Sequence, residues 1–500
     1  MSGFSPIPLG RRIPGALHSV SCSLPTMRDV IGYEEKRPET LEAMEAGYPR
    51  FLQHPCVAEL RARLTAASCR PGRTLWPVRS AKVAAALVRH LGGGETAALL
   101  GGTVHAAVHD DAAERPTRAR LYLQHTGGLI GSREAEDALV RGGWRGAAAS
   151  EELWAGDAAA EVQRVLGGLF AGTREADRVL AASGMSAMHA AFTAVNAVQA
   201  PRGRTAWLQL GWLYLDTIAV LKKFTANPAR DYLHQADALD LAALERTLHG
   251  HGSRLAGVVV EAPGNPLVQT PAVAAVAARC RAHGVRVVID PAISSPFNVD
   301  VLAHADVVAF SLTKYATPAG DVMAGAAVVN PGGPDAAALR TALTAETEPP
   351  YARDLARLAV QIGGAAEVVA RVNANTRRVA EFLEQHRRVK RVWWAGQAAC
   401  RANYRKIARH AAAWGGVISF ALREPPARFY DEVRVAKGPS FGMSRTLLCP
   451  YVYLAHYDLV GAREGRAELA ASGLEPELLR LSVGAEPVEE IVAELARALG

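Results

Sequence analysis

The sequence predicts an α/β fold in which a mostly parallel central sheet lies between helices, followed by a smaller α+β domain toward the C-terminal end. The main observation is a set of apolar runs that recur about every 25 residues, RLAGVVVEAP (254–263), GVRVVIDP (284–291) and ADVVAFSLT (305–313). Continuous apolar runs of this kind are typical of strands buried on both faces. Helical stretches such as AVAAVAARCRAHG (272–284) separate them, and this alternation indicates a parallel sheet.

Composition and charge narrow the class of protein. A chain of 500 residues with 49% hydrophobic residues exceeds what one minimal core needs, so two or three domains are expected. The net charge of +7 is modest and the basic residues are spread out, which argues against nucleic acid as a partner. The six cysteines lie far apart without a C-x-x-C pair, which argues against a disulfide framework and structural zinc and indicates a reducing cytosol. No stretch approaches roughly 18 apolar residues and no signal peptide is seen, so we expect a cytoplasmic protein without a membrane partner.

The chain is predicted to begin with an arm that ends in a helix, over residues 1–65. Residues 1–40 are rich in Pro, Gly and Ser without a sustained period, which is typical of an extended arm and not of a packed unit. A Tyr-Pro-Arg turn at 48–50 follows, and the helical pattern after it has one apolar face.

Short strand-like and helical patterns alternate across residues 66–155, which predicts an inserted α/β subdomain. Strands are expected at 74–78 (TLWPV) and 118–126 (RARLYLQHT), and helices at 81–91 and 132–143. Three roles for this segment stay open: covering the entrance of an active site, forming a subunit interface, or binding an effector.

Two other kinds of site are weakly indicated in the same segment. His105, His109 and His125 lack the helical H-x-x-x-H spacing with a carboxylate, so no metal site is predicted. The glycines of LGGGETAALLGG (91–102) suggest a dinucleotide site, but no strand precedes them and the G-x-G-x-x-G spacing is not kept.

The large domain is predicted at 156–385 and the C-terminal domain at 386–500. A long helical pattern at about 350–387 leads from one to the other. In the C-terminal domain, 417–424 and 478–486 are expected to be strands and 488–499 a closing helix.

Four features of the large domain lie where a predicted strand ends or a helix begins, which is the edge where open parallel sheets bind ligands. Ser183-Gly184-Met185 opens a helix, whose free N–H groups suit a phosphate. Pro-Gly-Asn-Pro at 263–266 is a tight turn that places the Asn265 amide at the edge. Taken alone, the first is an ordinary helix cap and the second a simple turn.

The other two features carry ionisable groups. Asp290 ends an apolar strand, where its carboxylate either caps the next helix or holds a protonated ring nitrogen. Lys314 lies between two apolar strands, and a lysine amine in apolar surroundings loses its proton more readily, as imine chemistry requires. Ser311 and Thr313 offer hydroxyls to a phosphate beside it. Together the four features supply a phosphate site, a partner for a pyridine nitrogen, a ring-oxygen donor and an imine lysine, which is the set of groups that holds pyridoxal 5'-phosphate (PLP).

In order and spacing these motifs resemble the Cys/Met metabolism PLP-dependent enzymes, the trans-sulfuration family, over roughly 41–65 and 156–500. That family combines a tyrosine–serine–arginine motif with Ser-Gly-Met, Tyr-Gly-Gly-Thr, Glu-x-Pro-x-Asn-Pro, Asp-Asn-Thr-x-x-x-Pro, Ser-x-Thr-Lys-Tyr and Arg-x-Ser-x-Gly. The corresponding positions here are Tyr48 to Arg50, Ser183 to Met185, Tyr214 to Thr217, Glu261 to Pro266, Asp290 to Pro296, Ser311 to Tyr315, and Arg480 to Gly484.

The resemblance implies the aspartate-aminotransferase type I fold and assigns roles to individual residues. Lys314 would bind PLP covalently and later carry protons, and Asp290 would pair with its pyridine nitrogen. Tyr214 would stack on the ring and act in catalysis. Residues that would contact the cofactor elsewhere are Ser183, Gly184, Met185, Asn265, Ser311 and Thr313.

Two further pairs of residues follow from the same resemblance. Tyr48 and Arg50 would reach the phosphate in a neighbouring subunit, so a homo-oligomer, a dimer of dimers, is expected. Arg480 and Ser440 would hold the α-carboxylate of an amino-acid substrate, a task for which a guanidinium with two parallel N–H groups is well suited.

The expected reaction is that of a cystathionine γ-synthase of methionine biosynthesis, in which cysteine replaces the acyl group of an O-acylhomoserine. The stretches 437–459 and 211–224 and the long insertion resemble the fungal-type branch of that enzyme, whereas the glutamate that often follows the family's Ser-Leu-Gly-Gly loop is missing after Ser440. An O-acylhomoserine sulfhydrylase and a cystathionine or methionine lyase share the same residues and stay open. A non-catalytic binding protein on the same fold is the remote alternative.

Overall fold

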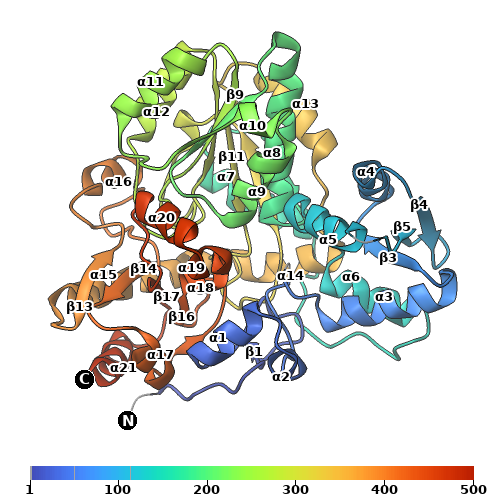
Figure 1. Cartoon of the computed structure of the whole chain (residues 1–500), viewed down its shortest axis with the longest axis horizontal. Helices are drawn as coiled ribbons and strands as arrows, with labels where there is room; N and C mark the ends of the chain where they lie inside the picture. The colour runs from blue at the N-terminus through green and yellow to red at the C-terminus, as the bar shows by residue number, and fades with distance from the viewer. Residues whose placement is uncertain (1–2, 50, 113) are drawn as a thin grey trace.

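The computed structural model of the protein describes residues 3–49, 51–112 and 114–500, and it confirms a mostly parallel sheet in the large domain (Figure 1). This sheet has seven strands in the order β6-β12-β11-β10-β9-β7-β8. The four pairs from β8 to β11 are parallel, whereas β12 pairs antiparallel with β11 and β6. The strands are β6 (Arg178–Ala181), β7 (Ala206–Leu210), β8 (Tyr232–Gln235), β9 (Leu255–Glu261), β10 (Arg286–Asp290), β11 (Val307–Ser311) and β12 (Gly325–Val329).

Helices cover both faces of this sheet, as its continuous apolar strands require. Successive residues of β9 alternate between two cores: Val258 and Val260 belong to one, Val259 to the other. Figure 1 shows α11 and α12 on one side of the sheet and α8 and α13 on the other. The covering helices are α7 (Ala158–Leu169), α8 (Gly184–Gln199), α9 (Leu215–Phe224), α11 (Leu241–His251), α12 (Val273–Ala282), α13 (Ala336–Glu346) and α14 (Ala352–Ile362).

The C-terminal domain is built on a five-stranded sheet in the order β13-β14-β17-β16-β15. Its strands are β13 (Val389–Trp393), β14 (Val417–Leu422), β15 (Ala436–Lys437), β16 (Leu447–Pro450) and β17 (Leu479–Ser482), and α15 (Ala365–Gln385) and α21 (Val488–Leu499) pack on it. The helical pattern predicted at 350–387 is two helices, because Gly363 and Gly364 separate α14 from α15.

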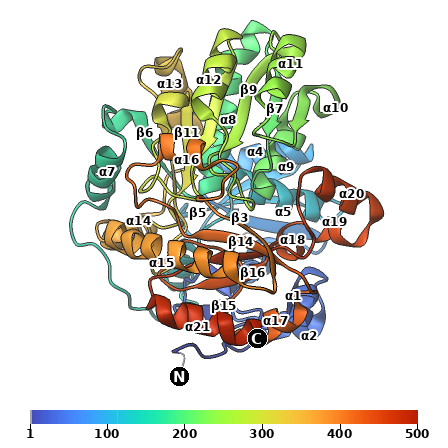
Figure 2. The ribbon, with the colours of Figure 1, turned by 90° about the vertical axis from the view of Figure 1, so that its left-hand side faces the viewer.

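Residues 3–40 form a packed unit, so the prediction of a purely extended arm was wrong. A short hairpin, β1 (Arg12–Ile13) with β2 (Ser21–Cys22), leads into α1 (Met27–Glu34) and α2 (Pro38–Glu42). Leu24, Val30 and Tyr33 are buried in the same core as the C-terminal sheet. Figure 2 shows α1 and α2 beside α17 (Ala427–Glu432), at the far end of the chain.

The inserted segment forms a separate α/β layer with the sheet order β3-β5-β4, made of β3 (Arg73–Val78), β5 (Val104–Asp110) and β4 (Glu95–Leu99). Around it lie α3 (Pro55–Ser68), α4 (Ala81–Leu91), α5 (Arg115–Thr126) and α6 (Ser132–Arg141).

The strand predicted at 118–126 was wrong, because these residues belong to α5. Both ends of this helix carry residues typical of helix ends. Pro116 lies in its first turn, and the helix ends at Gly127, whose φ is 71°. Ala119 and Leu123, one helical turn apart, are its buried face. Within the described residues no helix is both long and apolar enough to span a bilayer.

Candidate active site

One cavity brings together every predicted site residue that the structure describes. It lies where the carboxyl ends of the parallel strands meet the C-terminal domain and the N-terminal arm, and it encloses about 1090 Å³, part of it open to solvent. Arg50, which was also predicted, lies outside the described residues. The predicted residues that line the cavity are Tyr48, Ser183, Gly184, Met185, Tyr214, Asn265, Asp290, Ser311, Thr313, Lys314, Ser440 and Arg480.

Lys314 follows β11 and is 7% exposed, so its amine is nearly buried in the cavity wall. Its Nζ donates to Ser440 Oγ at 2.5 Å and to the Tyr48 hydroxyl at 3.3 Å. The ring of Phe441 lies 4.9 Å from the same nitrogen. Two hydroxyls and an aromatic face therefore fix the amine, as a nucleophile or a proton carrier requires.

Ser440 has a strained backbone, with φ of 89° in the left-handed region that favours glycine. Tyr315, next to Lys314, is also left-handed, with φ of 63°. Its hydroxyl donates to Ile293 O and accepts from Gly416 N, both at 2.9 Å, and these bonds stabilise the turn. Strained residues of this kind concentrate at functional sites, where surrounding contacts maintain them.

Arg480 lies in β17 and is 6% exposed. One terminal nitrogen donates to Asn265 Oδ1 at 3.0 Å and the other to the carbonyl of Ser440 at 3.1 Å. The rings of Phe441 and Tyr451 lie 5.1 and 4.9 Å from the guanidinium carbon. A buried, aligned guanidinium at a cavity wall suits recognition of a carboxylate.

Asp290 ends β10 directly opposite Glu261, which ends β9. Burial raises the pKa of Asp290 to about 7, while the Ala292 N–H, which Oδ1 accepts at 2.8 Å, acts in the opposite direction. Burial, and next the charge of Asp290, raise the pKa of Glu261 well above its usual range. A cationic nitrogen beside Asp290 would stabilise its ionised form, as the protonated pyridine of PLP does.

The start of α8 has the structure of an anion site. Ser183 caps the helix and its Oγ accepts from Ser186 N at 3.1 Å, whereas Gly184 and Met185 line the cavity with the first N–H groups of the helix. A Cβ on Gly184 would lie 2.8 Å from Ser311 Cβ, so this close approach requires glycine. The Thr313 hydroxyl bonds the backbone of residue 324, so its predicted phosphate contact competes with an existing bond.

Tyr214 lines the cavity at the start of α9, and its backbone N–H donates to Glu261 Oε1 at 2.5 Å. Its hydroxyl lies 3.3 Å from Oδ2 of the fully buried Asp216. The other oxygen of Asp216 accepts from Gln124 Nε2, on α5 of the inserted subdomain, at 2.9 Å. The inserted subdomain is therefore linked to the cavity residue Tyr214 through Asp216.

Tyr48 was expected to reach the phosphate site of a neighbouring subunit, and that role stays a prediction. Within the single chain its hydroxyl lies 3.3 Å from Lys314 Nζ. The arm packs on the C-terminal domain, and this brings the 48–49 turn to the cavity.

Three cavity residues were missed as site candidates: Glu261, Phe441 and Tyr451. Glu261 was visible only as the first residue of the Glu-x-Pro-x-Asn-Pro motif, and Phe441 and Tyr451 only within the stretch 437–459. The buried Tyr451 hydroxyl has no hydrogen-bond partner among the described residues, so it is a donor available to a ligand. Their roles depend on contacts between domains that no local pattern contains.

The residues present fit PLP. The amine of Lys314, the carboxyl of Asp290 and the start of α8 match its aldehyde, pyridine nitrogen and phosphate in chemistry. Tyr214, predicted to stack on the ring, also lines the cavity.

Comparison with known proteins agrees with this assignment. The family model described as Cys/Met metabolism PLP-dependent enzyme matches residues 160–500. The L-2-amino-4-chloropent-4-enoate dechlorinase/desaturase of Streptantibioticus cattleyicolor is 42% identical over 489 residues, 97% of each chain. Because so little is left unaligned, this similarity includes most of the arm and the inserted subdomain, which precede the family match.

Two other similar proteins match a smaller part of the chain. The cystathionine γ-synthase of Neurospora crassa is 33% identical over 335 residues, 66% of this chain and 53% of its own. The crystal structure of cystathionine γ-synthase from Xanthomonas oryzae, with aminoacrylate and cysteine, superposes with a TM-score of 0.58 at 23% identity. It covers 69% of this chain and 86% of its own, and it confirms the fold predicted for the large and C-terminal domains.

Proposed function

The chain belongs to the Cys/Met metabolism PLP-dependent enzyme family, and on that premise we propose that it expels a leaving group from the γ-carbon of an L-α-amino acid. The first candidate substrate is L-2-amino-4-chloropent-4-enoate, in which chlorine is on carbon 4, the γ-carbon. Loss of chloride and one carbon-bound proton as HCl would leave a more unsaturated amino acid. The 42% identity across 97% of both chains supports this choice over reactions of relatives that match less of the chain.

The observation that carries the proposal is the composition of the cavity wall. Among its described residues, the cationic ones are Lys314 and Arg480. The rest of the wall is largely apolar or aromatic, with members such as Phe51, Met188 and Leu454. Such a cavity offers one anchor for an α-carboxylate and an apolar surface for a short unsaturated side chain. Cysteine as a second substrate would bring a second carboxylate, for which the described wall holds no further cation.

The predicted cavity residues have separate tasks in this reaction. Bound PLP supplies an electron sink that makes protons on the α- and β-carbons of the substrate removable. Arg480 binds the α-carboxylate with the N–H groups that Asn265 and Ser440 leave free. Asp290, ionised, holds the pyridine nitrogen in its cationic form, and the start of α8 holds the phosphate.

Lys314 is the base for these protons, since its amine is the basic nitrogen that lies in the cavity wall beside the predicted cofactor site. Ser440 Oγ and the Tyr48 hydroxyl hold the amine in place and accept its hydrogens when it is protonated. The Tyr451 hydroxyl is a buried donor that can stabilise a departing chloride. The apolar wall excludes water, which would otherwise add to the unsaturated product.

Cystathionine γ-synthase activity is the second candidate. It is supported by the Neurospora crassa relative and by the resemblance of 437–459 to the fungal-type enzymes. The same residues would expel an acyl group from the γ-carbon before cysteine adds. A sulfhydrylase would use sulfide instead, and a lyase would need no second substrate.

One experiment separates these candidates. The purified PLP-loaded enzyme is given L-2-amino-4-chloropent-4-enoate in one reaction, and O-acetyl- or O-succinylhomoserine with cysteine in a second. A third contains the same donors with sulfide, and a fourth contains cystathionine. Chloride release with loss of HCl in the product mass supports the proposal. Cystathionine from the second reaction without chloride from the first overturns it in favour of the γ-synthase.

The Lys314→Ala variant is the matched control for every reaction. Homocysteine from sulfide, or breakdown of cystathionine, with no chloride release would also overturn the dechlorination proposal. Either result would identify a sulfhydrylase or a lyase.

A further inference from the structure

A second cavity lies beside the active site, and its wall comes largely from the inserted subdomain and the turn that leads into it. It encloses about 780 Å³, part of it open to solvent, which is a size typical of small-molecule sites. The residues that line both cavities are Val20, Pro49, Phe51 and Met323, so the two are neighbours. None of the described residues predicted to hold PLP or substrate lines the second cavity, so it is separate from the predicted active site.

Arg61 of α3 lies in the wall of this cavity. Its guanidinium carbon is 3.8 Å from the centre of the Trp76 ring, and its Nε donates to Leu75 O at 2.8 Å. Trp76 is fixed in turn, because its indole N–H donates to His109 Nε2 at 3.0 Å. These contacts hold the plane of the guanidinium, and its two terminal nitrogens make no hydrogen bond with the part of the chain that the structure describes.

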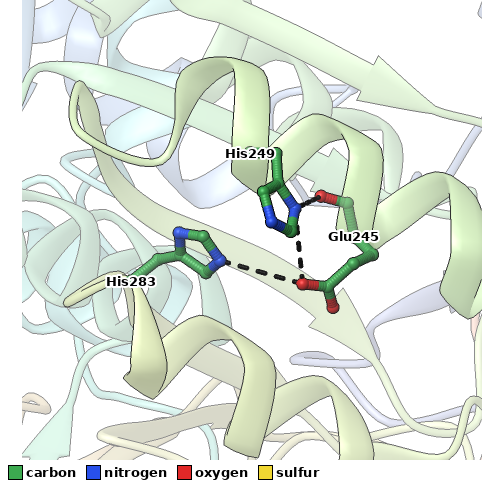
Figure 3. A group of neighbouring side chains, drawn as sticks. All are labelled: Glu245, His249 and His283. Atoms are coloured by element: carbon green, nitrogen blue, oxygen red, sulfur yellow. Dashed lines mark hydrogen bonds and ion pairs between the residues drawn. The ribbon is translucent and has the colours of Figure 1, made fainter.

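A partly buried arginine elsewhere in the protein shows what Arg61 lacks. Arg279 Nε lies 2.9 Å from Glu245 Oε2, so its charge is paired. The other oxygen of this carboxylate is 3.4 Å from His249 Nδ1 and 3.9 Å from His283 Nε2 (Figure 3). Glu245 therefore has its partners already, whereas Arg61 forms no ion pair among the described residues.

The surroundings of Arg61 make its positive charge costly. Burial lowers the pKa of Arg61, and the charge of Asp111 acts in the opposite direction. The Asp111 carboxylate accepts from the Thr74 hydroxyl and forms no ion pair with Arg61. A partly buried cation without a paired anion costs free energy, which an anion bound in the cavity would offset.

Two further groups in the wall can donate hydrogen bonds. Gln53 Nε2 is buried and has no hydrogen-bond partner within the described ranges. Arg120 donates to Gln124 Oε1 at 3.2 Å and makes no ion pair with any residue that the structure describes. Val57 and Ile130, both buried, add apolar surface beside these donors. Such a wall favours a ligand with an anionic acceptor and an apolar body.

The two acids in the wall of the second cavity are already paired. Asp354 Oδ1 accepts from Arg133 Nη1, and Asp321 Oδ2 accepts from Arg357 Nε, both at 2.9 Å. Because these carboxylates are neutralised by their own arginines, they do not compete with a ligand for Arg61.

We propose that the second cavity binds a small carboxylic acid, with its carboxylate on the terminal nitrogens of Arg61 and its apolar part against Trp76 and Ile130. A planar guanidinium with parallel N–H groups matches the two oxygens of a carboxylate. The cavity thus favours ligand binding among the three roles left open for residues 66–155. The acid binds beside the substrate and not in its place, so the inference does not depend on which leaving group the enzyme expels.

Ligand-observed NMR titration with pentanoate tests this site, because pentanoate has no amine that could react with PLP. The PLP-loaded Arg480→Ala variant is used, so that the predicted carboxylate anchor of the active site is absent. We expect pentanoate to bind this variant and pentanamide, its neutral analogue, to bind at least about tenfold more weakly. Adding Arg61→Ala should weaken pentanoate binding by about a hundredfold or more, the loss expected for two hydrogen bonds to a charged group.

Arg63→Ala is the matched control in the same background, since Arg63 is an exposed arginine of α3, and it should leave pentanoate binding unchanged. Arg61→Gln, which keeps a donor but removes the charge, replaces the alanine variant if the latter loses the visible PLP band of the folded enzyme. Equal pentanoate affinity with and without the substitution of Arg61 would overturn the proposal. Failure of pentanoate to bind the Arg480→Ala variant would overturn it as well, and this is the result expected if a neighbouring chain fills the cavity.

Discussion

Replacement of Arg480 by alanine should remove the carboxylate anchor of the active site. A guanidinium has five N–H donors, and Asn265 and Ser440 account for two of those of Arg480. Three donors remain, which is enough for two parallel bonds to a substrate carboxylate. Phe441 and Tyr451 hold the group in place, so substrate binding needs little reorganisation.

The size of the loss follows from these two bonds. A hydrogen bond to a charged group contributes about 1.5–3 kcal/mol, so two contribute about 3–6 kcal/mol. At about 1.4 kcal/mol for each factor of ten, kcat/KM should fall by roughly 10²- to 10⁴-fold. Arg480→Lys keeps the charge but loses the paired donors, so its kcat/KM should lie between those of the wild type and the alanine variant.

Steady-state chloride release measures kcat/KM, and the visible absorption of bound PLP shows whether the cofactor site is intact. Arg391, an exposed arginine of the same C-terminal sheet, provides the control variant Arg391→Ala. We expect the PLP spectrum to be unchanged in both variants. If Arg480→Ala kept kcat/KM within about threefold of the wild type, Arg480 would not be the carboxylate anchor.

Three further predictions test other parts of the site. Lys314→Ala should abolish turnover and the visible PLP band together; a band that still responds to borohydride would place the covalent link at another residue. Because burial raises the pKa of Asp290 from about 3.9 when unfolded to about 7, the unfolded chain loses this proton first, so the stability of the cofactor-free protein falls as pH rises between these values. Thermal melts should thus show stability falling from pH 5 to about pH 7, and Asp290→Asn should weaken that dependence; an identical pH profile would contradict it. Gln124→Leu removes a donor from buried Asp216 and should lower the free energy of unfolding by about 1.5–3 kcal/mol and weaken PLP binding, as denaturant unfolding and PLP titration would show. Unchanged PLP affinity would mean that the subdomain does not support Tyr214.

The large domain could be read from the sequence because its signals are local. The runs at 254–263, 284–291 and 305–313 contain β9, β10 and β11, since a strand buried on both faces is apolar throughout. The segment 118–126 failed because its alternating letters resemble a strand, whereas Pro116 and Gly127 mark the ends of a helix.

The arm failed for a different reason. Leu24, Val30 and Tyr33 are buried against the C-terminal domain, about 400 residues further along the chain. Three apolar side chains can pack on the surface of another domain without recurring at the period of a strand or of a helix. Because the spacing of these three residues sustains neither period, the sequence did not predict that the arm is packed.

By itself the sequence determined the fold class and the cofactor, and it predicted residues that meet in one cavity. Strand ends, helix caps and the flanks of Lys314 are local features that a parallel sheet gathers at one edge. The tertiary structure alone decided that the Tyr48 hydroxyl lies beside Lys314 and that Glu261 lies beside Asp290. It also decided that Gln124 of the inserted subdomain supports Tyr214 through Asp216. These contacts join residues distant in the chain, and their energy comes from burial and pairing across domains, which no local pattern records.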